Sequence, residues 1–206
     1  LHPRIDWSAH TSGVVGTEFP LIPFLAALLY PLTGVQEWVG RAISLAFWAL
    51  SYPFFYSLVR RIYGGEQLGL FAAAAYSFVP LSVMAGRSFM PDMAALCLVL
   101  IGMDQLLNAM DSGRSRAFVL ATLALGLGLL VKLPYVIVGI PLLAVLLSQE
   151  GFRVLLDRRL LTVAAISLLP SAGWYWHASL IPTAELVMGS GDVHVFGAEG
   201  FGISSL

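Results

Sequence analysis

The stretch GLGLLVKLPYVIVGIP, residues 126–141, places a single lysine inside apolar sequence. The apolar run around it extends from 117 to 148, which is too long for one helix that crosses a bilayer in about 20 residues. Lys132 and Pro134 interrupt this run, because a proline disfavours the helical conformation in the residue before it. The stretch therefore predicts two short membrane helices that form a hairpin around the lysine.

The composition of the whole chain agrees with a membrane environment. Its 206 residues are 58% hydrophobic and 11% charged, whereas a soluble domain carries about 25% charged residues. The net charge of -1 provides no basic field that would attract nucleic acid. The single cysteine, Cys97, excludes an internal disulfide and a cysteine-cluster metal site. No Walker, HExxH, GxSxG or CxxC motif is present, so nothing indicates a soluble nucleotide-dependent enzyme.

Hydropathy windows predict about six spans and one shorter helix. The segment 20–33 is short and contains three prolines, which is typical of an interfacial or juxtamembrane helix. The expected fold is all-α, a polytopic transmembrane helix bundle. The predicted spans are roughly 38–59, 67–86, 91–110, 117–131, 133–148 and 160–180.

The positive charges predict which connectors share a side of the membrane. If six spans alternate, three connectors share one side and together contain Arg60, Arg61, Arg114, Arg116, Arg153, Arg158 and Arg159. The positive-inside rule makes that side cytoplasmic. We therefore expect a multi-pass protein of the inner (cell) membrane. Residues 1–206 would form part of one integral membrane domain, in which any site faces outward and the outer segments are 1–37, 86–92, 131–134 and 181–206.

The first outer loop, HPRIDWSAHTSGVVGTEFPL, holds several polar side chains. Asp6, His10 and Glu18 lie in a loop rich in glycine, serine and threonine, which can order around a sugar or a phosphate. The alternative is an ordinary solvated loop in which Glu18 caps the following helix, where a carboxylate is stabilised by the helix dipole. Both roles for Glu18 are compatible.

Two further outer turns carry charge. In GRSFMPDMAAL, residues 86–96, Asp92 either complements the dipole of the next helix and pairs with Arg87, or lies at the rim of a cavity where Arg87 holds a phosphate oxygen. Lys132 either extends to the interface as an anchor or faces a phosphate. Since charge at membrane depth is costly, both turns are candidate sites.

Other residues have simpler interpretations. Asp104 lies near the cytoplasmic end of its span, where pairing or snorkelling is expected. The aromatic residues at 174–176 are typical of an interfacial belt. Gly126, Gly128 and Gly139 suit close helix packing.

The segment GTEFPLIPFLAALLYPLTGVQEWVGRAISLAFWAL, residues 16–50, resembles the region after the first outer loop of polyprenyl-phosphate-sugar-dependent glycosyltransferases. These are the protein mannosyltransferase-like and aminoarabinose-transferase-like proteins of the GT-C superfamily, glycosyltransferase family 39 in the broad sense. GRSFMPDMAAL resembles the second outer loop of the family, and GLGLLVKLPYVIVGIPLL resembles its Lys-Pro hairpin. The resemblance extends over about residues 10–180.

This resemblance implies transfer of a sugar from a polyprenyl phosphate to an outer-face lipid, glycan or protein acceptor, with inversion. Glu18 and Asp92 would be catalytic or would bind a divalent cation. Arg87, Lys132, His10 and Asp6 would bind substrate. The resemblance also implies that an essential Asp and a first helix lie upstream of Leu1, and that C-terminal helices are missing, so the fragment alone would be inactive.

Two other functions compete with this interpretation. A transporter or flippase would line its pathway with Lys132 and Asp92, and its broken helices would resemble the interrupted 117–148 stretch. A purely structural membrane subunit would use the same charges as interfacial anchors. The sequence contains no convincing internal repeat of the kind that many transporters have.

Overall fold

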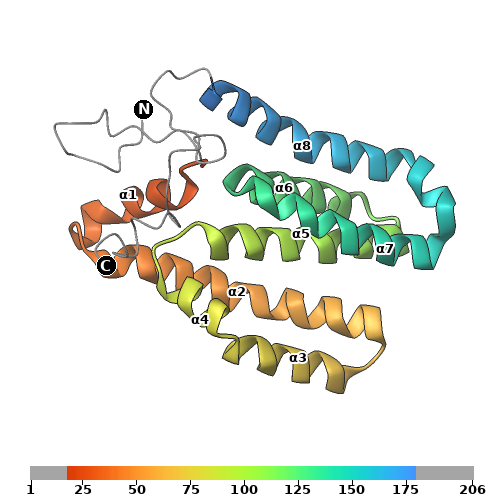
Figure 1. Cartoon of the computed structure of the whole chain (residues 1–206), viewed down its shortest axis with the longest axis horizontal. Coiled ribbons are helices and arrows are strands. Elements are labelled where there is room, and N and C mark those ends of the chain that lie inside the picture. Colours follow the sequence, from red (N-terminus) through yellow and green to blue (C-terminus); the bar gives the residue numbers. More distant parts are fainter. Residues whose placement is uncertain (1–17, 180–206) are drawn as a thin grey trace, which may run out of the picture. The chain divides into compact units, whose positions relative to one another are not determined.

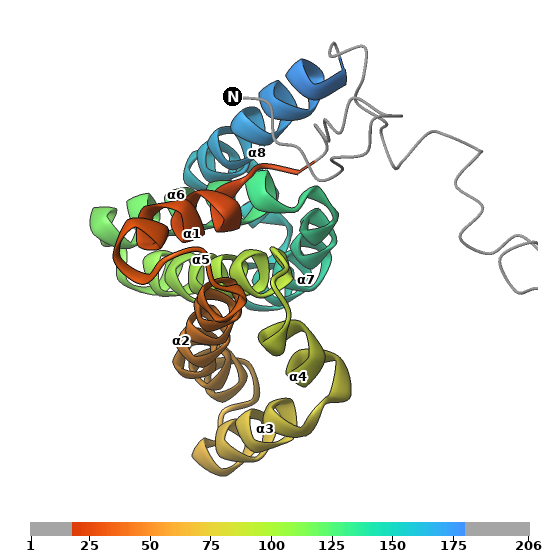
Figure 2. The ribbon, with the colours of Figure 1, turned by 90° about the vertical axis from the view of Figure 1, so that its left-hand side faces the viewer.

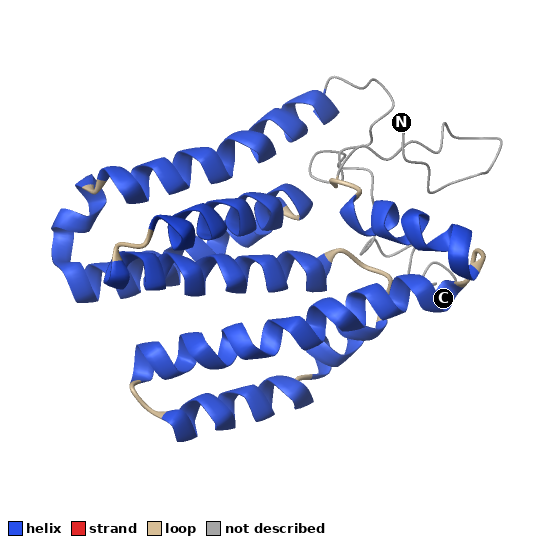
Figure 3. Ribbon diagram, turned by 180° about the vertical axis from the view of Figure 1, so that it is seen from behind, coloured by secondary structure: helices blue, strands red, loops and turns tan. Residues whose placement is uncertain are grey.

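The computed structural model of the chain describes residues 18–179. The chain divides into two compact units, and the unit Phe19–Gly173 contains nearly all of the described residues. Every regular element in the described part is helical (Figure 3), which confirms the all-α prediction. The elements are α1 (Leu21–Thr33), α2 (Glu37–Tyr63), α3 (Glu66–Phe78), α4 (Pro80–Arg87), α5 (Asp92–Ser112), α6 (Ser115–Val131), η1 (Leu133–Val138), α7 (Gly139–Glu150), η2 (Gly151–Leu156) and α8 (Arg158–Ser179).

The predicted short helix at 20–33 and the predicted helix break at Lys132 and Pro134 are both present. The helix α1 has 13 residues, too few to cross a bilayer, and Pro31 lies inside it. The helix α6 ends at Val131, and Lys132 adopts an extended backbone before the 3-10 helix η1 begins. Pro134 lacks the N–H group that a continued α-helix would use, which favours a break at this point.

The number of spans is smaller than the six predicted. Among the described residues, three segments are long and apolar enough to cross a membrane, namely Glu37–Tyr63, Asp92–Ser112 and Leu133–Leu156. The predicted span 67–86 is instead two helices bent by 62°, because Val79 is extended before Pro80. Counting that bent pair as one span gives four.

The other two predicted spans form helices that do not qualify as spans. The helix α6 has only 17 residues. The helix α8 has 22 residues, but its last two turns are rich in polar and aromatic side chains. Shortness in α6 and polarity in α8 therefore account for the difference from the hydropathy windows.

The helix α5 lies at the centre of the unit Phe19–Gly173. It packs between α2 and α6, as Figure 2 shows, and two thirds of its apolar window is buried, compared with about a fifth for α2. Its contact with α6 is close: a Cβ added at Gly102 would lie 2.5 Å from Leu125 Cγ. A Cβ at Gly128 would lie 2.8 Å from a methyl group of Val99. Glycine thus allows the two backbones to approach.

The three predicted packing glycines behave differently. Gly128 faces α5 as expected, and a Cβ at Gly126 would make ordinary contact with Ser167 at 3.5 Å. The prediction for Gly139 is wrong, since a Cβ there would meet open space. Gly139 is the first residue of α7, directly after η1, and no described helix approaches it closely.

The cationic connectors gather at one end of the helices. The guanidinium of Arg61, at the end of α2, forms an ion pair with Asp111 at the end of α5. Arg159, at the start of α8, lies 5.5 Å from the ring centre of Phe118 at the start of α6. The turns at 87–92 and 131–133 lie at the other end of α5 and α6 (Figure 1). The two sets of turns thus lie at opposite ends, as the charge pattern predicted.

We expect Gly102→Ala to destabilise the full-length protein. The added methyl group overlaps Leu125, including its backbone nitrogen at 2.9 Å, so a helix must shift. Overpacking costs about 1–3 kcal/mol, which lowers Tm by roughly 2–12 °C for a chain of this size. Thermal unfolding in detergent measures the effect.

Gly139→Ala is the matched control for this prediction. Its methyl group enters open space, so Tm should stay unchanged or rise. Equal Tm values for the two alanine variants would contradict the close α5–α6 contact.

Candidate functional site

The hairpin break and the start of α5 meet in an ion pair. Lys132 Nζ lies 2.7 Å from Asp92 Oδ1. Pro91 precedes α5 and makes Asp92 its first residue, while the end of α6 presents Lys132 beside it. The two side chains are 25% and 29% exposed, so the pair is largely shielded from solvent. The structure thus brings together two of the residues that the sequence singled out.

A tyrosine hydroxyl adds a second contact at the same place. We call the contact formed by Asp92, Lys132 and Tyr135 the corner. Tyr135, in η1, donates a hydrogen bond of 3.3 Å from its hydroxyl to the backbone carbonyl of Asp92. This bond joins η1 to the first turn of α5 in addition to the ion pair. Sequence reasoning missed Tyr135; the available signal was a tyrosine three residues after the only lysine of the chain.

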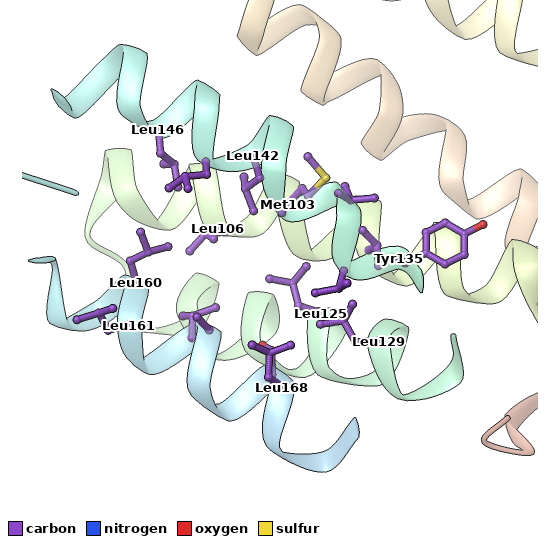
Figure 4. Close-up of a pocket in the computed structure, with 18 of the residues that line it drawn as sticks. Met103, Leu106, Leu125, Leu129, Tyr135, Leu142, Leu146, Leu160, Leu161 and Leu168 are labelled. Atoms are coloured by element: carbon purple, nitrogen blue, oxygen red, sulfur yellow. The ribbon is translucent and has the colours of Figure 1, made fainter. Parts of the chain in front are cut away.

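An apolar pocket of about 300 Å³ lies beside this corner. Side chains of α5, α6, α7 and the first half of α8 line it, and most of those labelled in Figure 4 are leucines. Tyr135 lines one edge, and Figure 4 shows its hydroxyl pointing away from the leucines. The ring of Tyr135 therefore belongs to the pocket, while its hydroxyl belongs to the polar corner.

Sequence reasoning also missed this pocket. The sequence feature that could have indicated the pocket is a set of leucines in α7, at 142, 143 and 146, whose spacing places them on one face of the helix. The sequence could not show which other helix faces this one.

Arg87 does not join the pair. It is exposed at the end of α4, and within the described part of the chain it forms no ion pair with Asp92. The predicted Arg87–Asp92 pair is therefore wrong, because the carboxylate of Asp92 pairs with Lys132 instead. Arg87 lines two other pockets together with Arg41 of α2.

The first outer loop is mostly outside the described residues. Asp6 and His10 both lie there, so their predicted roles in substrate binding stay predictions. Glu18 is described: it is exposed and lies in a bend before α1. Pro20 is the N-cap residue of α1, so Glu18 is not that cap.

Asp104 is buried rather than snorkelling. Its side chain accepts a hydrogen bond of 2.6 Å from Ser57 of α2, and Gln105 donates another at 3.1 Å. The pairing alternative for this residue is thus the correct one, with a hydroxyl as the partner from α2. This contact joins α2 to α5 within the bundle.

The described residues do not assemble a metal centre. No group of three or more His, Cys, Asp or Glu side chains lies together between 18 and 179. Asp92, one of the two predicted ligands, already faces an ammonium group, which repels a cation. A divalent cation held by Glu18 and Asp92 stays a prediction.

The comparisons with known proteins identify the family. The family model of dolichyl-phosphate-mannose-protein mannosyltransferases matches residues 17–176, more than three quarters of the chain. The chain belongs to this family. The family consists of membrane glycosyltransferases of the mannosyltransferase kind, and the apolar helices agree that this is a membrane protein. Searches of curated proteins and of solved structures gave no significant match.

The match to the mannosyltransferase family includes every element that builds the corner. Asp92, Lys132 and Tyr135 all lie within residues 17–176, as does Glu18. The family assignment therefore rests on the same part of the chain as the ion pair and the apolar pocket.

The ion pair should show energetic coupling between its partners. In the full-length mannosyltransferase, Asp92→Asn and Lys132→Met each leave one charged or polar partner shielded from water. The double variant removes both, so its loss of stability should be smaller than the sum of the single losses by about 0.5–3 kcal/mol. A double-mutant cycle of chemical or thermal unfolding measures this coupling; strictly additive losses would contradict a pair in the folded protein.

Proposed function

We propose that this chain carries the donor-binding part of a membrane glycosyltransferase that uses a polyprenyl-phosphate sugar. The observation that supports the proposal best is the Lys132–Asp92 pair at the edge of the apolar pocket, joined to it through Tyr135. A polyprenyl phosphate has the same two parts, a charged head and a hydrocarbon chain.

The head of the donor would interact with Lys132. A lysine ammonium is a compact positive charge that donates hydrogen bonds to oxygen atoms, and one such bond of Lys132 goes to Asp92. Asp92 holds the ammonium in place, so we assign it a positioning role in which it orients Lys132 toward phosphate oxygens. A fixed positive charge in a shielded site stabilises the phosphate as it leaves.

The chain of the donor would occupy the apolar pocket. Its walls are almost wholly hydrocarbon, and α5, α6, η1, α7, η2 and α8 all contribute to it. An isoprenoid chain gains free energy by contact with such walls in proportion to the apolar area that is buried. The Tyr135 ring would mark the boundary between the chain and the phosphate.

The reaction is a substitution at the anomeric carbon. The oxygen of an acceptor hydroxyl forms a bond to that carbon, the bond from the carbon to the phosphate oxygen breaks, and the polyprenyl phosphate leaves with the electron pair. The hydroxyl proton passes to a carboxylate, for which Glu18 is the proposed base. Asp6, His10 and Arg87 stay proposed substrate-binding residues. The acceptor is a lipid, a glycan or a protein.

The proposed active site faces outward from the inner membrane. The cationic connectors at the opposite end of the helices support this orientation, because positive charge favours the cytoplasmic side. An enzyme on the outer side has no access to cytosolic nucleotide sugars, so a lipid-borne donor would supply the activated sugar.

Asp92→Asn and Lys132→Met should greatly reduce sugar transfer by the full-length protein. Loss of one preorganised charge at a leaving group lowers the rate by about 10²–10³-fold. The assay is transfer of labelled mannose from polyprenyl-phosphate mannose in membranes with equal amounts of folded protein. The matched control is Asp111→Asn, which breaks the ion pair at the other end of α5 and should leave transfer within a few-fold of wild type.

Transfer at the wild-type rate in both corner variants would contradict the proposal and favour a structural role. Passage of the lipid across the membrane without transfer would favour the transporter alternative.

Glu18→Gln should lower kcat with little change in the apparent affinity for the donor. The amide keeps the size of the side chain but cannot accept a proton, and a general base contributes about 10²–10⁴-fold to the rate. Steady-state kinetics with varied donor separate the two parameters. A change confined to KM would contradict the role as a base and indicate substrate binding.

A further inference from the structure

A second site lies between α2 and α4, on the side of α2 where α4 runs beside it (Figure 1). The pocket there has a volume of about 810 Å³. Trp38, Ala42 and Leu45 of α2 form one wall at helical spacing, and Val83 and Met84 of α4 form the other. None of these side chains belongs to the Lys132–Asp92 corner, so the pocket is a separate feature.

The two walls are held in fixed positions by close contacts. A Cβ at Gly86 would lie 3.0 Å from the ring of Trp48, so α4 packs directly on α2. A Cβ at Gly40 would overlap the ring of Phe89, so the turn after α4 packs on the first turns of α2. The pocket is therefore formed by the fold itself.

Two arginines lie between this pocket and a neighbouring one. Arg41 and Arg87 line it, and both also line a neighbouring pocket of about 500 Å³. Arg41 pairs with Glu37 one turn earlier at 3.2 Å, whereas Arg87 forms no ion pair with any residue from 18 to 179. The three side chains together carry one net positive charge, which a single phosphodiester would neutralise.

The neighbouring pocket is more polar. Gln36 and Glu37 line it together with Tyr30 of α1. Along the surface the order is thus an apolar groove, two guanidinium groups and a polar hollow. A glycerophospholipid has the same order of acyl chain, phosphate and hydroxyl-bearing headgroup. Arg41 is also one turn inside α2, which is long and apolar enough to cross a membrane, so it would lie at the depth of lipid phosphates.

We infer that this site binds an anionic glycerophospholipid, with phosphatidylglycerol as the matching headgroup. Arg41 and Arg87 hold the phosphate, since guanidinium groups make charge-assisted hydrogen bonds to its oxygens. One acyl chain lies along Leu45, Val83 and Met84. The site would tie α4, the shorter arm of the bent pair, to α2 through a bound lipid.

The test uses the full-length protein in phosphatidylcholine nanodiscs, with and without phosphatidylglycerol. Native mass spectrometry counts the lipid that stays bound, and thermal unfolding measures its stabilising effect. We expect phosphatidylglycerol to bind and to raise Tm in wild type. Arg87→Gln should weaken binding by about tenfold, the effect of losing one charge-assisted hydrogen bond.

Ala42→Trp tests the apolar part of the site while both arginines remain. Ala42 is exposed on α2, so a tryptophan there fills the pocket without disturbing the core, and lipid binding should fall as in Arg87→Gln. The matched controls are Arg60→Gln, at the other end of α2, and Leu70→Trp, on the exposed face of α3. Both controls should bind the lipid like wild type.

Three results would overturn the inference. Equal lipid retention in all variants would mean that the arginines only extend into the surrounding lipid. Equal stabilisation by soluble glycerol 3-phosphate would mean an anion site without a chain. Stronger dependence on Arg41 and Arg87 for polyprenyl phosphate than for phosphatidylglycerol would assign the pocket to the donor.

Discussion

A charged side chain at membrane depth requires a partner, and this requirement determines the arrangement of the hairpin. An uncompensated ammonium in apolar surroundings is costly, so Lys132 must meet an opposite charge or reach water. The start of α5 provides that charge, because Pro91 fixes where the helix begins and Asp92 is its first residue. The pair therefore joins the hairpin to the central helix, and Tyr135 adds a second bond across the same contact.

The close packing of α5 against α6 makes this contact possible. Gly102 and Gly128 let the two helices approach, which brings the end of α6 beside the start of α5. Further along α5, the buried Asp104 bonds to Ser57 of α2, and Asp111 in the last turn pairs with Arg61. The helix α5 is thus held by polar contacts along its length, and the pocket lies beside its apolar core.

The sequence predicted features that depend on local chemistry. The prolines allowed the helix break at Lys132 and the short helix α1 to be predicted, and the apolar composition predicted an all-α membrane protein. The sequence did not predict the bend at Val79, since hydropathy averages over a window and does not register one extended residue. It also paired Asp92 with Arg87, its neighbour along the chain, whereas the true partner is 40 positions away. Contacts of that kind depend on which helices pack together.

Lys132 and Arg87 illustrate why residues of equal charge at one end of the helices have different chemistry. Lys132 is shielded and bonded to a carboxylate, so its charge is fixed beside an apolar pocket and suits a leaving phosphate. Arg87 is exposed and faces a wide groove that continues into a polar hollow, so its charge suits a phosphate that stays bound. A planar guanidinium favours lasting contact with several oxygens, while an ammonium acts as a point charge. The fold thus separates two cationic groups that the resemblance placed in a single site, and under the two proposals they would hold different phosphates.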